Sequence, residues 1–293
     1  MVNKLHSIYA QIALSSWNIG VHTVCSLLLL NIYRKNDGPG VQQLYLLNLS
    51  AVELIKNLFF LVFCVSIVVE FQLPHTIMWL CYSCIDLIFI LVMTIITADR
   101  LIASLLNLQY AGTFTPFRAK ITIFCAWFVS FILTPSMFGI LYAAHGFTAL
   151  DDAVSYTHKF IFPTLYVLYI VFASITYLIM FMIFVRSRRR SSYAQQSAFQ
   201  LFTHSKFYVA LLLIASFLLF SVIPMLIKSG MRLKIIAQNQ NVDNVMNICF
   251  YISDTADGII YILFYPPVRN ILRKVLCKFC DTPLQEQGST VAA

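Results

Sequence analysis

The stretch from 43 to 69 is QLYLLNLSAVELIKNLFFLVFCVSIVV, an unbroken apolar run whose only charged residues are Glu53 and Lys56. A helix rises about 1.5 Å per residue, so a run of this length is enough to cross the roughly 30 Å hydrocarbon layer of a bilayer. Lipid offers no water to backbone N–H and C=O groups, and a helix satisfies those groups within one segment. The stretch therefore predicts a membrane-spanning helix.

Apolar blocks of similar length recur along the chain and predict a membrane protein of the all-α class. Short connections between the blocks leave no room for a second domain, so residues 1–293 are expected to form one seven-helix transmembrane bundle. The predicted spans are 8–33, 43–69, 76–99, 119–143, 160–185, 206–228 and 245–267.

Composition supports the same conclusion. Hydrophobic residues make up 60% of the chain, charged residues only 11%, and the mean hydropathy is +0.80, whereas a soluble domain carries about 25% charged residues. The net charge of +8 does not predict a nucleic-acid partner, because the basic residues fall in the loops between apolar blocks, where they set orientation.

Lys and Arg are distributed unevenly between the two sets of loops. With the amino terminus outside, fourteen of them fall on the cytoplasmic side and five on the outer side. Because cytoplasmic loops carry the excess of positive residues, the pattern predicts a multi-pass plasma-membrane protein with an extracellular amino terminus.

The segment after the seventh span has a different pattern. Pro266 and Pro267 break the helix, and 268–280 alternates basic with apolar residues, which predicts a short amphipathic helix on the inner membrane surface. Cys277 and Cys280 beside these basic residues are candidate palmitoylation sites, with unmodified thiols as the alternative. Residues 281–293 are expected to form a disordered tail.

Five charged residues fall inside predicted spans, where charge is costly and by default marks function. Estimated from the helical rise, all five lie about 15 to 21 Å from the cytoplasmic end of their helices, so they share one layer near the bilayer centre. They are Glu53, Lys56, Asp86, Asp254 and Asp257.

Four carboxylates and one ammonium in a thin layer cannot all stay ionised without partners. Either a cation such as sodium enters, or some of the acids are protonated. Our hypothesis is that Lys56 is a built-in counterion to Glu53 and to one aspartate of the last span, since Glu53 and Lys56 share a helix face at i,i+3. The alternative is that these groups only hold helices together.

The third span ends in Asp99-Arg100-Leu101 and continues to Asn107-Leu108-Gln109-Tyr110. This resembles the Asp-Arg-Tyr motif and following loop of rhodopsin-like (class A) G-protein-coupled receptors. The resemblance implies that the arginine, held at rest by its neighbouring acid, is freed to meet a heterotrimeric G protein on activation. An exposed ion pair is expected here, and such a pair contributes only about 0 to 1 kcal/mol.

Further positions agree with this family in order along the chain. The segment 47–53 resembles the second-helix signature, with Glu53 replacing its aspartate, and 257–261 resembles the seventh-helix signature that ends in a tyrosine, here Tyr261. Trp127, Tyr177 and Pro224 stand where the fourth, fifth and sixth helices carry a tryptophan, a tyrosine and a proline. The resemblance implies an activation switch made of Asp99, Arg100, Leu108, Tyr177, Pro224 and Tyr261.

The chain also departs from the family pattern. His75 replaces the disulfide cysteine of the third helix, and Phe220-Ser221-Val222-Ile223-Pro224 lacks the tryptophan of the sixth. Gly258 replaces a proline, and no first-helix asparagine is evident around 20–24. The missing disulfide and the short amino terminus are similar to melanocortin-like and adenosine-like receptors. A pairing of Cys81 with Cys84 stays open against two free thiols.

The resemblance also bears on the ligand, a small molecule or peptide that the sequence does not identify. Tyr82 occupies the position of the amine-binding aspartate of monoamine receptors, and Tyr251 that of the retinal lysine of opsins, so neither ligand is expected. The expected pocket lies between the second, third, sixth and seventh helices and is lined by Tyr82, Asp86, Phe220 and Tyr251.

Two other classes of function compete with a receptor. An enzyme is not expected, because the six histidines are scattered without the spacing of zinc ligands, and no metal or cofactor is predicted apart from sodium. An ion or solute transporter or channel is the alternative suggested by the buried charges. The odd number of spans and the lack of an inverted repeat argue against it.

Overall fold

The fold is taken from a computed structural model of the whole chain. The structure describes residues 2–35, 40–69, 75–106, 110–145, 153, 156–190, 212, 215–232, 235–237, 239–265, 268–271 and 273.

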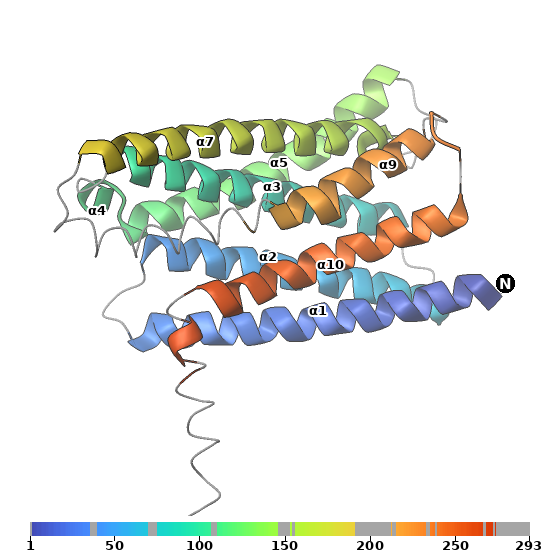
Figure 1. The fold of residues 1–293 in the computed structure, drawn as a ribbon. Coiled ribbons are helices and arrows are strands. Elements are labelled where there is room, and N and C mark those ends of the chain that lie inside the picture. The colour runs from blue at the N-terminus through green and yellow to red at the C-terminus, as the bar shows by residue number, and fades with distance from the viewer. Residues whose placement is uncertain are drawn as a thin grey trace, which may run out of the picture.

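Within these residues the secondary structure is helical, and no strand occurs among them. Long helices run side by side along a common axis (Figure 1). The elements are α1 (Val2–Lys35), α2 (Val41–Val68), α3 (His75–Leu106), α4 (Tyr110–Thr113), α5 (Pro116–His145), the π-helix η2 (Thr157–Ile161), α7 (Phe162–Arg190), the π-helix η3 (Leu218–Val222), α9 (Ile223–Arg232) and α10 (Gln240–Phe264).

Five of the helices are long and apolar enough to cross a membrane: α1, α2, α3, α5 and α7. Two more predicted spans fall short of that standard. The apolar stretch Ala215–Met231, which includes η3, is shorter, and α10 has 25 residues with Asp243, Asp254 and Asp257 among them. The chain is thus an all-helical protein with the architecture of a multi-pass membrane protein.

Helix α3 lies at the centre of the packing. It contacts α2, α5 and α7, while α1 contacts α2 and α10. In its most apolar window 67% of the residues are buried, against 22 to 33% in the other four long helices. Ile88 and Val92 of α3 join Leu49 and Val52 of α2 and Phe217 in the main apolar core.

The outer surface of the bundle is apolar, as lipid requires. On α5 the rings of Phe124, Phe128 and Phe131 are all more than half exposed, and Phe124 stacks on Phe128. No aqueous surface could hold such rings at low cost, because exposed apolar patches of this kind drive association in water. The exposed rings therefore favour a lipid environment around α5.

Gly258 brings α10 close to α1. A Cβ atom at this position would lie 2.5 Å from Cγ1 of Val21, which is far inside van der Waals contact. A glycine here lets the two helix backbones approach, and this approach carries the polar residues of α1 to the charged residues of α10.

Several predicted features lie wholly or partly outside the described residues. These are the start of the span predicted at 206–228, Leu108, Pro266 and Pro267, Cys277 and Cys280, and the tail 281–293. Of the predicted amphipathic segment 268–280, residues 268–271 and 273 are described and are helical. Tyr261 lies in α10, but its side chain is not among those that the structure describes.

Candidate functional site

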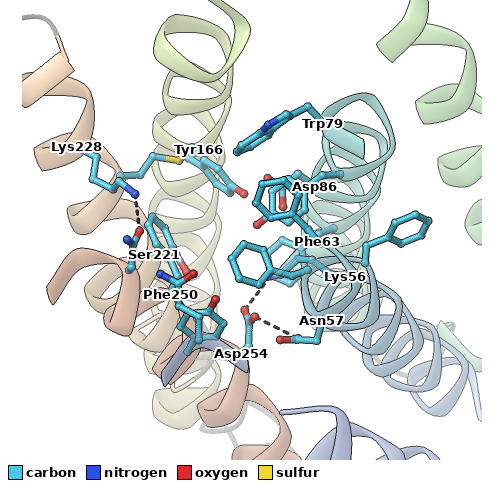
Figure 2. Close-up of a pocket in the computed structure, with 18 of the residues that line it drawn as sticks. Lys56, Asn57, Phe63, Trp79, Asp86, Tyr166, Ser221, Lys228, Phe250 and Asp254 are labelled. Atoms are coloured by element: carbon cyan, nitrogen blue, oxygen red, sulfur yellow. Dashed lines mark hydrogen bonds and ion pairs between the residues drawn. The ribbon is translucent and has the colours of Figure 1, made fainter. Parts of the chain in front are cut away.

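A cavity of about 220 Å³ opens between α2, α3, α7, η3, α9 and α10. Figure 2 shows side chains from these elements directed into it. Three charged groups of the predicted layer line the cavity, namely Lys56, Asp86 and Asp254. The cavity is therefore surrounded mainly by aromatic side chains. We call its charged part, formed by Lys56, Asp86 and Asp254, the floor.

Lys56 of α2 forms ion pairs with two carboxylates at the floor. Its Nζ lies 3.0 Å from Oε2 of Glu53 and 2.8 Å from Oδ1 of Asp254, and it sits 5.1 Å from the ring centroid of Phe89. The first pair lies within α2 and the second joins α2 to α10. The ion pairs expected between Lys56 and two carboxylates are thus present, and the aspartate involved is Asp254.

A layer of amides behind the floor fixes these groups. Asn57 donates through Nδ2 to Oδ2 of Asp254 at 3.3 Å and to the carbonyl of Glu53 at 2.9 Å. Asn18 of α1 donates to Oδ1 of Asn57 and to the carbonyl of Tyr251, each at 3.3 Å, and it accepts from Thr255. Three helices are therefore tied together by one hydrogen-bond network.

His22 supports the same region from α1. Its Nε2 lies 2.8 Å from the backbone carbonyl of Asp254, and Ser50 of α2 donates to the carbonyl of His22 at 3.2 Å. Buried polar groups need such partners. Together these bonds fix the backbone of α10 at the residue whose side chain meets Lys56.

Asp86 differs from the other charged groups of the floor. The residue is 5% exposed and lines the cavity, and Figure 2 shows its side chain at the cavity wall contributed by α3. Among the described residues its carboxylate accepts no hydrogen bond and has no basic group within 4 Å. A buried acid without a partner is costly, so Asp86 is a group to which a ligand can bind.

Asp257 lies apart from the cavity. It is 1% exposed, and neither carboxylate oxygen has a hydrogen-bond partner among the described residues. It follows Asp254 by three residues, one turn along the same face of α10. The structure brings Glu53, Lys56 and Asp254 into contact, with Asp86 on the same chamber, while Asp257 is buried outside the lining.

Aromatic rings form most of the upper wall. Phe60 packs against Tyr82 and edge-on against Tyr251, with centroids 6.5 and 5.6 Å apart, and Trp79 meets Tyr82 edge-on at 6.0 Å. On the opposite side Phe217 packs against Tyr166 at 5.3 Å. Such edge-to-face contacts hold the rings in defined orientations, so the chamber is preformed.

A second lysine lines the cavity, on α9. Lys228 donates to Oδ1 of Asn247 at 2.6 Å and lies 3.5 Å from Oδ1 of Asp243, both on α10. Its ammonium is also 5.7 Å from the ring centroid of Phe250. Lys228 thus ties α9 to α10, and its charge is offset by Asp243.

The Asp99-Arg100 pair lies further along α3. Arg100 forms an ion pair with Asp99, and the hydroxyl of Tyr110 donates to the other oxygen of the same carboxylate. The exposed pair expected from sequence is wrong in one respect, because the Asp99 side chain is 2% and the Arg100 side chain 12% exposed. Tyr110 in α4 and the flanking helices cover it.

Tyr110 remains a hydrogen-bond donor at physiological pH. Burial of its ring, with its hydrogen bond to Asp99 as a second cause, raises the pKa of the Tyr110 phenol well above its usual value. Asp99 therefore has two donors, and Nε of Arg100 is buried with no partner among the described residues. On α7, Tyr177 packs with Met180 against Leu101.

One predicted pocket residue lies elsewhere. Tyr82, Asp86 and Tyr251 line the cavity, but Phe220 does not, and Phe217 and Ser221 from the same segment take its place. The π-helix Leu218–Val222 is the physical reason, because its wider turns rotate the side chains relative to an α-helical register. Ser221 donates to Ser253 of α10 at 2.8 Å.

Several residues of the site are neutral or lie near helix ends, and the sequence does not single them out. They are Asn18, His22, Asn57, Trp79 and Lys228. Asn57 is the one with a weak signal in the sequence, because it is a polar residue directly after Lys56 inside a predicted span. Cys81 and Cys84 are both free thiols, and no group of three metal-ligating side chains occurs among the residues that were described.

Comparison with known proteins adds no relative to this description. Neither the family models nor the curated proteins contain a match to the chain.

Proposed function

We propose that this chain is a seven-helix receptor of the rhodopsin-like class that binds an extracellular ligand in the cavity and signals to a heterotrimeric G protein in the plasma membrane. The observation that carries the proposal is that one buried helix, α3, bears both Asp86 at the cavity and Arg100 in a tyrosine-capped ion pair. A ligand-responsive group and a candidate transducer contact thus share one rigid element.

The surface of α10 supports its assignment as the seventh span. Its exposed apolar residues recur every three to seven positions and are Val245, Ile248, Ile252, Ile259 and Leu263. Asp254 and Asp257 are buried on the opposite side. A helix with an apolar exposed stripe and a polar buried face suits lipid rather than water, and Leu219, Ile223 and Leu226 give the sixth span a similar exposed stripe.

The Asp99-Arg100 pair supports the signalling part of the proposal. Two donors converge on one carboxylate, so loss of either contact loosens the hold on Arg100. We expect a ligand-induced shift of α3 to release the guanidinium toward the G protein. The amino terminus then lies outside the cell, and Cys277 and Cys280 lie inside, where they are accessible to palmitoylation.

A G-protein activation assay with panels of small molecules and peptides tests the proposal. Wild type is compared with Arg100→Ala, which is expected to abolish coupling, and with Lys120→Ala, an exposed basic residue on α5, which is expected to retain it at matched surface expression. Asp99→Asn is expected to raise basal signalling severalfold. Equal signalling by wild type and Arg100→Ala would contradict the receptor function.

An ion or solute transporter is a second candidate, favoured by the ion-paired layer of Glu53, Lys56 and Asp254. Charged groups that line a water-accessible chamber are typical of transport pathways. Voltage clamp separates the two candidates. Charge movement that disappears in Lys56→Met, together with no G-protein response to any compound, would favour transport.

A further inference from the structure

We propose that the cavity binds a small organic cation, an ammonium group on an aromatic or aliphatic body, and that Asp86 is the residue its charge meets. This names the ligand class of the proposed receptor and rests on that function for its physiological meaning. The binding itself can be measured without any signalling partner.

The first argument is the balance of charge at the floor. In their ionised forms Glu53 and Asp254 carry two negative charges, and Lys56 offsets one of them while contacting both. Asp86 adds a further negative charge to the lining. When all three acids are ionised the floor together with Glu53 holds one ammonium for three carboxylates, and a cationic ligand at Asp86 offsets part of that excess.

The second argument is the state of Asp86. The Lys56 ammonium is already held at 3.0 and 2.8 Å by two other carboxylates, whereas no donor lies within hydrogen-bond distance of Asp86 among the described residues. The side chain is nine-tenths buried yet faces the chamber. An unmet carboxylate in that setting gains strongly from a charge-assisted hydrogen bond.

The third argument concerns the kind of cation. The chamber holds about 220 Å³, and Tyr82, Tyr166 and Phe217 line it together with Asp86. Small inorganic cations are bound by shells of six or more oxygen ligands, whereas most of the lining is apolar or aromatic carbon with few oxygens. Aromatic faces instead attract organic ammonium groups and pack against their apolar bodies, so an organic cation fits the chamber better than a metal ion.

The position of Asp86 reverses the expectation drawn from Tyr82, which disfavoured an amine ligand. Asp86 follows Tyr82 by four residues, which places it one turn further along the same face of α3. A cation at Asp86 therefore lies one turn further along α3 than Tyr82, with that phenol ring beside it. Lys228 contributes little repulsion to such a ligand, since Asp243 and Asn247 already hold its ammonium.

Thermal stabilisation of the purified full-length protein in detergent tests this inference. The probes are phenethylamine, tryptamine and isoamylamine, each compared with the alcohol of the same skeleton, and hydrocinnamate as an anion. A ligand that binds only the folded protein raises Tm by an amount set by the ratio of its free concentration to its Kd, so each probe is tested over a range of concentrations. We expect at least one amine to raise Tm by about 3 °C or more, and the alcohols and hydrocinnamate to leave it unchanged.

Substitutions test whether the Asp86 carboxylate is the group that binds the ammonium. Asp86→Asn is expected to weaken amine binding at least tenfold, and Asp86→Glu to keep the preference for amine over alcohol. Asp257→Asn is the matched control, because it removes an equal charge from α10 outside the cavity lining, and it is expected to keep that preference too. If Asp86→Asn fails to fold, the order of the probes on wild type tests the ligand class, and a changed amine affinity in Asp86→Glu but not in Asp257→Asn tests the role of Asp86.

The outcomes are distinct from those of the signalling assay. An amine effect that depends on Asp86 supports the inference even if no G protein responds. The inference is overturned if none of the three amines stabilises the protein, if hydrocinnamate stabilises it more than phenethylamine, or if Asp86→Asn retains the full effect. It is also overturned if sodium chloride, but not potassium chloride or any amine, stabilises through Asp86.

Discussion

At the scale of single residues, the ammonium of Lys56 forms ion pairs with two carboxylates, Glu53 of α2 and Asp254 of α10. Removing one member of a buried ion pair leaves an uncompensated charge, which costs about 3 to 5 kcal/mol. The Lys56 side chain is 13% exposed and contacts both Glu53 and Asp254, and among the described residues no other lysine or arginine pairs with these two carboxylates. The stability of the α2–α10 contact therefore depends strongly on this one side chain.

We expect Lys56→Met to lower Tm markedly and Lys56→Met/Glu53→Gln to recover part of the loss, since the double variant no longer buries the unpaired Glu53 charge. Lys228→Met is the control, because its ion pair with Asp243 is 3.5 Å long and Asp243 is 42% exposed. Differential scanning fluorimetry of the detergent-purified variants measures all three. An additive double variant would argue that Lys56 does not act through Glu53.

The charged residues of the site could be predicted from sequence because charge inside an apolar run is rare. Lys56 was assigned to Glu53 from their spacing, and its pairing with a residue of the last span followed from depth. Asn18 and His22 were not found, since neutral polar residues in a span carry no comparable signal. Their partners on α10 lie more than 230 positions away, and only the packing of α1 on α10 brings these groups together.

At the scale of helices, the apolar blocks locate the spans but not the ends of the helices. The second block, 43–69, matches α2 (Val41–Val68) closely, while the third was expected to end at 99 and α3 continues to Leu106. Hydropathy marks where a chain leaves the hydrocarbon. A helix satisfies its own backbone and continues beyond that boundary for as long as its side chains find contacts.

The rotation of the sixth span could not be predicted either. In an α-helix Phe220 lies near the face of Phe217 three residues earlier, but the π-helix Leu218–Val222 has wider turns, and Phe217 and Ser221 line the cavity without Phe220. Pro224 follows directly, and proline lacks the N–H that an α-helix would bond. Local widening before a proline depends on neighbouring helices, which a one-dimensional pattern does not contain.

The contact of α1 with α10 yields a prediction at this scale. Gly258→Ala places a methyl group 2.5 Å from Val21, so the two helices must separate or Val21 must turn away. We expect a lower Tm for Gly258→Ala and partial recovery in Gly258→Ala/Val21→Ala.

Gly139→Ala in α5 is the matched control, because no atom lies within 4 Å of its added Cβ. Alanine there favours the helix by up to about 1 kcal/mol, so Tm is expected to stay equal or rise. Thermal unfolding of both variants beside wild type decides the matter, and an unchanged Tm for Gly258→Ala would show that the helices do not approach so closely.

At the scale of the whole molecule, the number of crossings decides on which side each loop lies. Seven crossings with an outer amino terminus put residues 235–237 outside the cell. Five crossings, with the last two helices on the inner side, would put the same residues inside. Ala237 is exposed, so a reporter group there distinguishes the two arrangements.

We expect Ala237→Cys to react with a membrane-impermeant maleimide on intact cells, above the background from the native cysteines. Lys120→Cys, at the opposite end of the bundle on α5, is expected to react only after the cells are permeabilised. Mass-tag labelling on gels measures both. Labelling of the two sites only after permeabilisation would rule out seven crossings with this orientation.

Helix α3 is enclosed on several sides and contains neither glycine nor proline between His75 and Leu106. Asp86 and Arg100 are fourteen residues apart on it, about 21 Å along the axis and close to four full turns, so both project in similar directions. A rod confined in this way resists bending and moves more readily by sliding or rolling as one piece. A displacement of α3 by a fraction of an ångström near Asp86 therefore displaces Arg100 by a similar amount, because the helix between them has no hinge at which it bends.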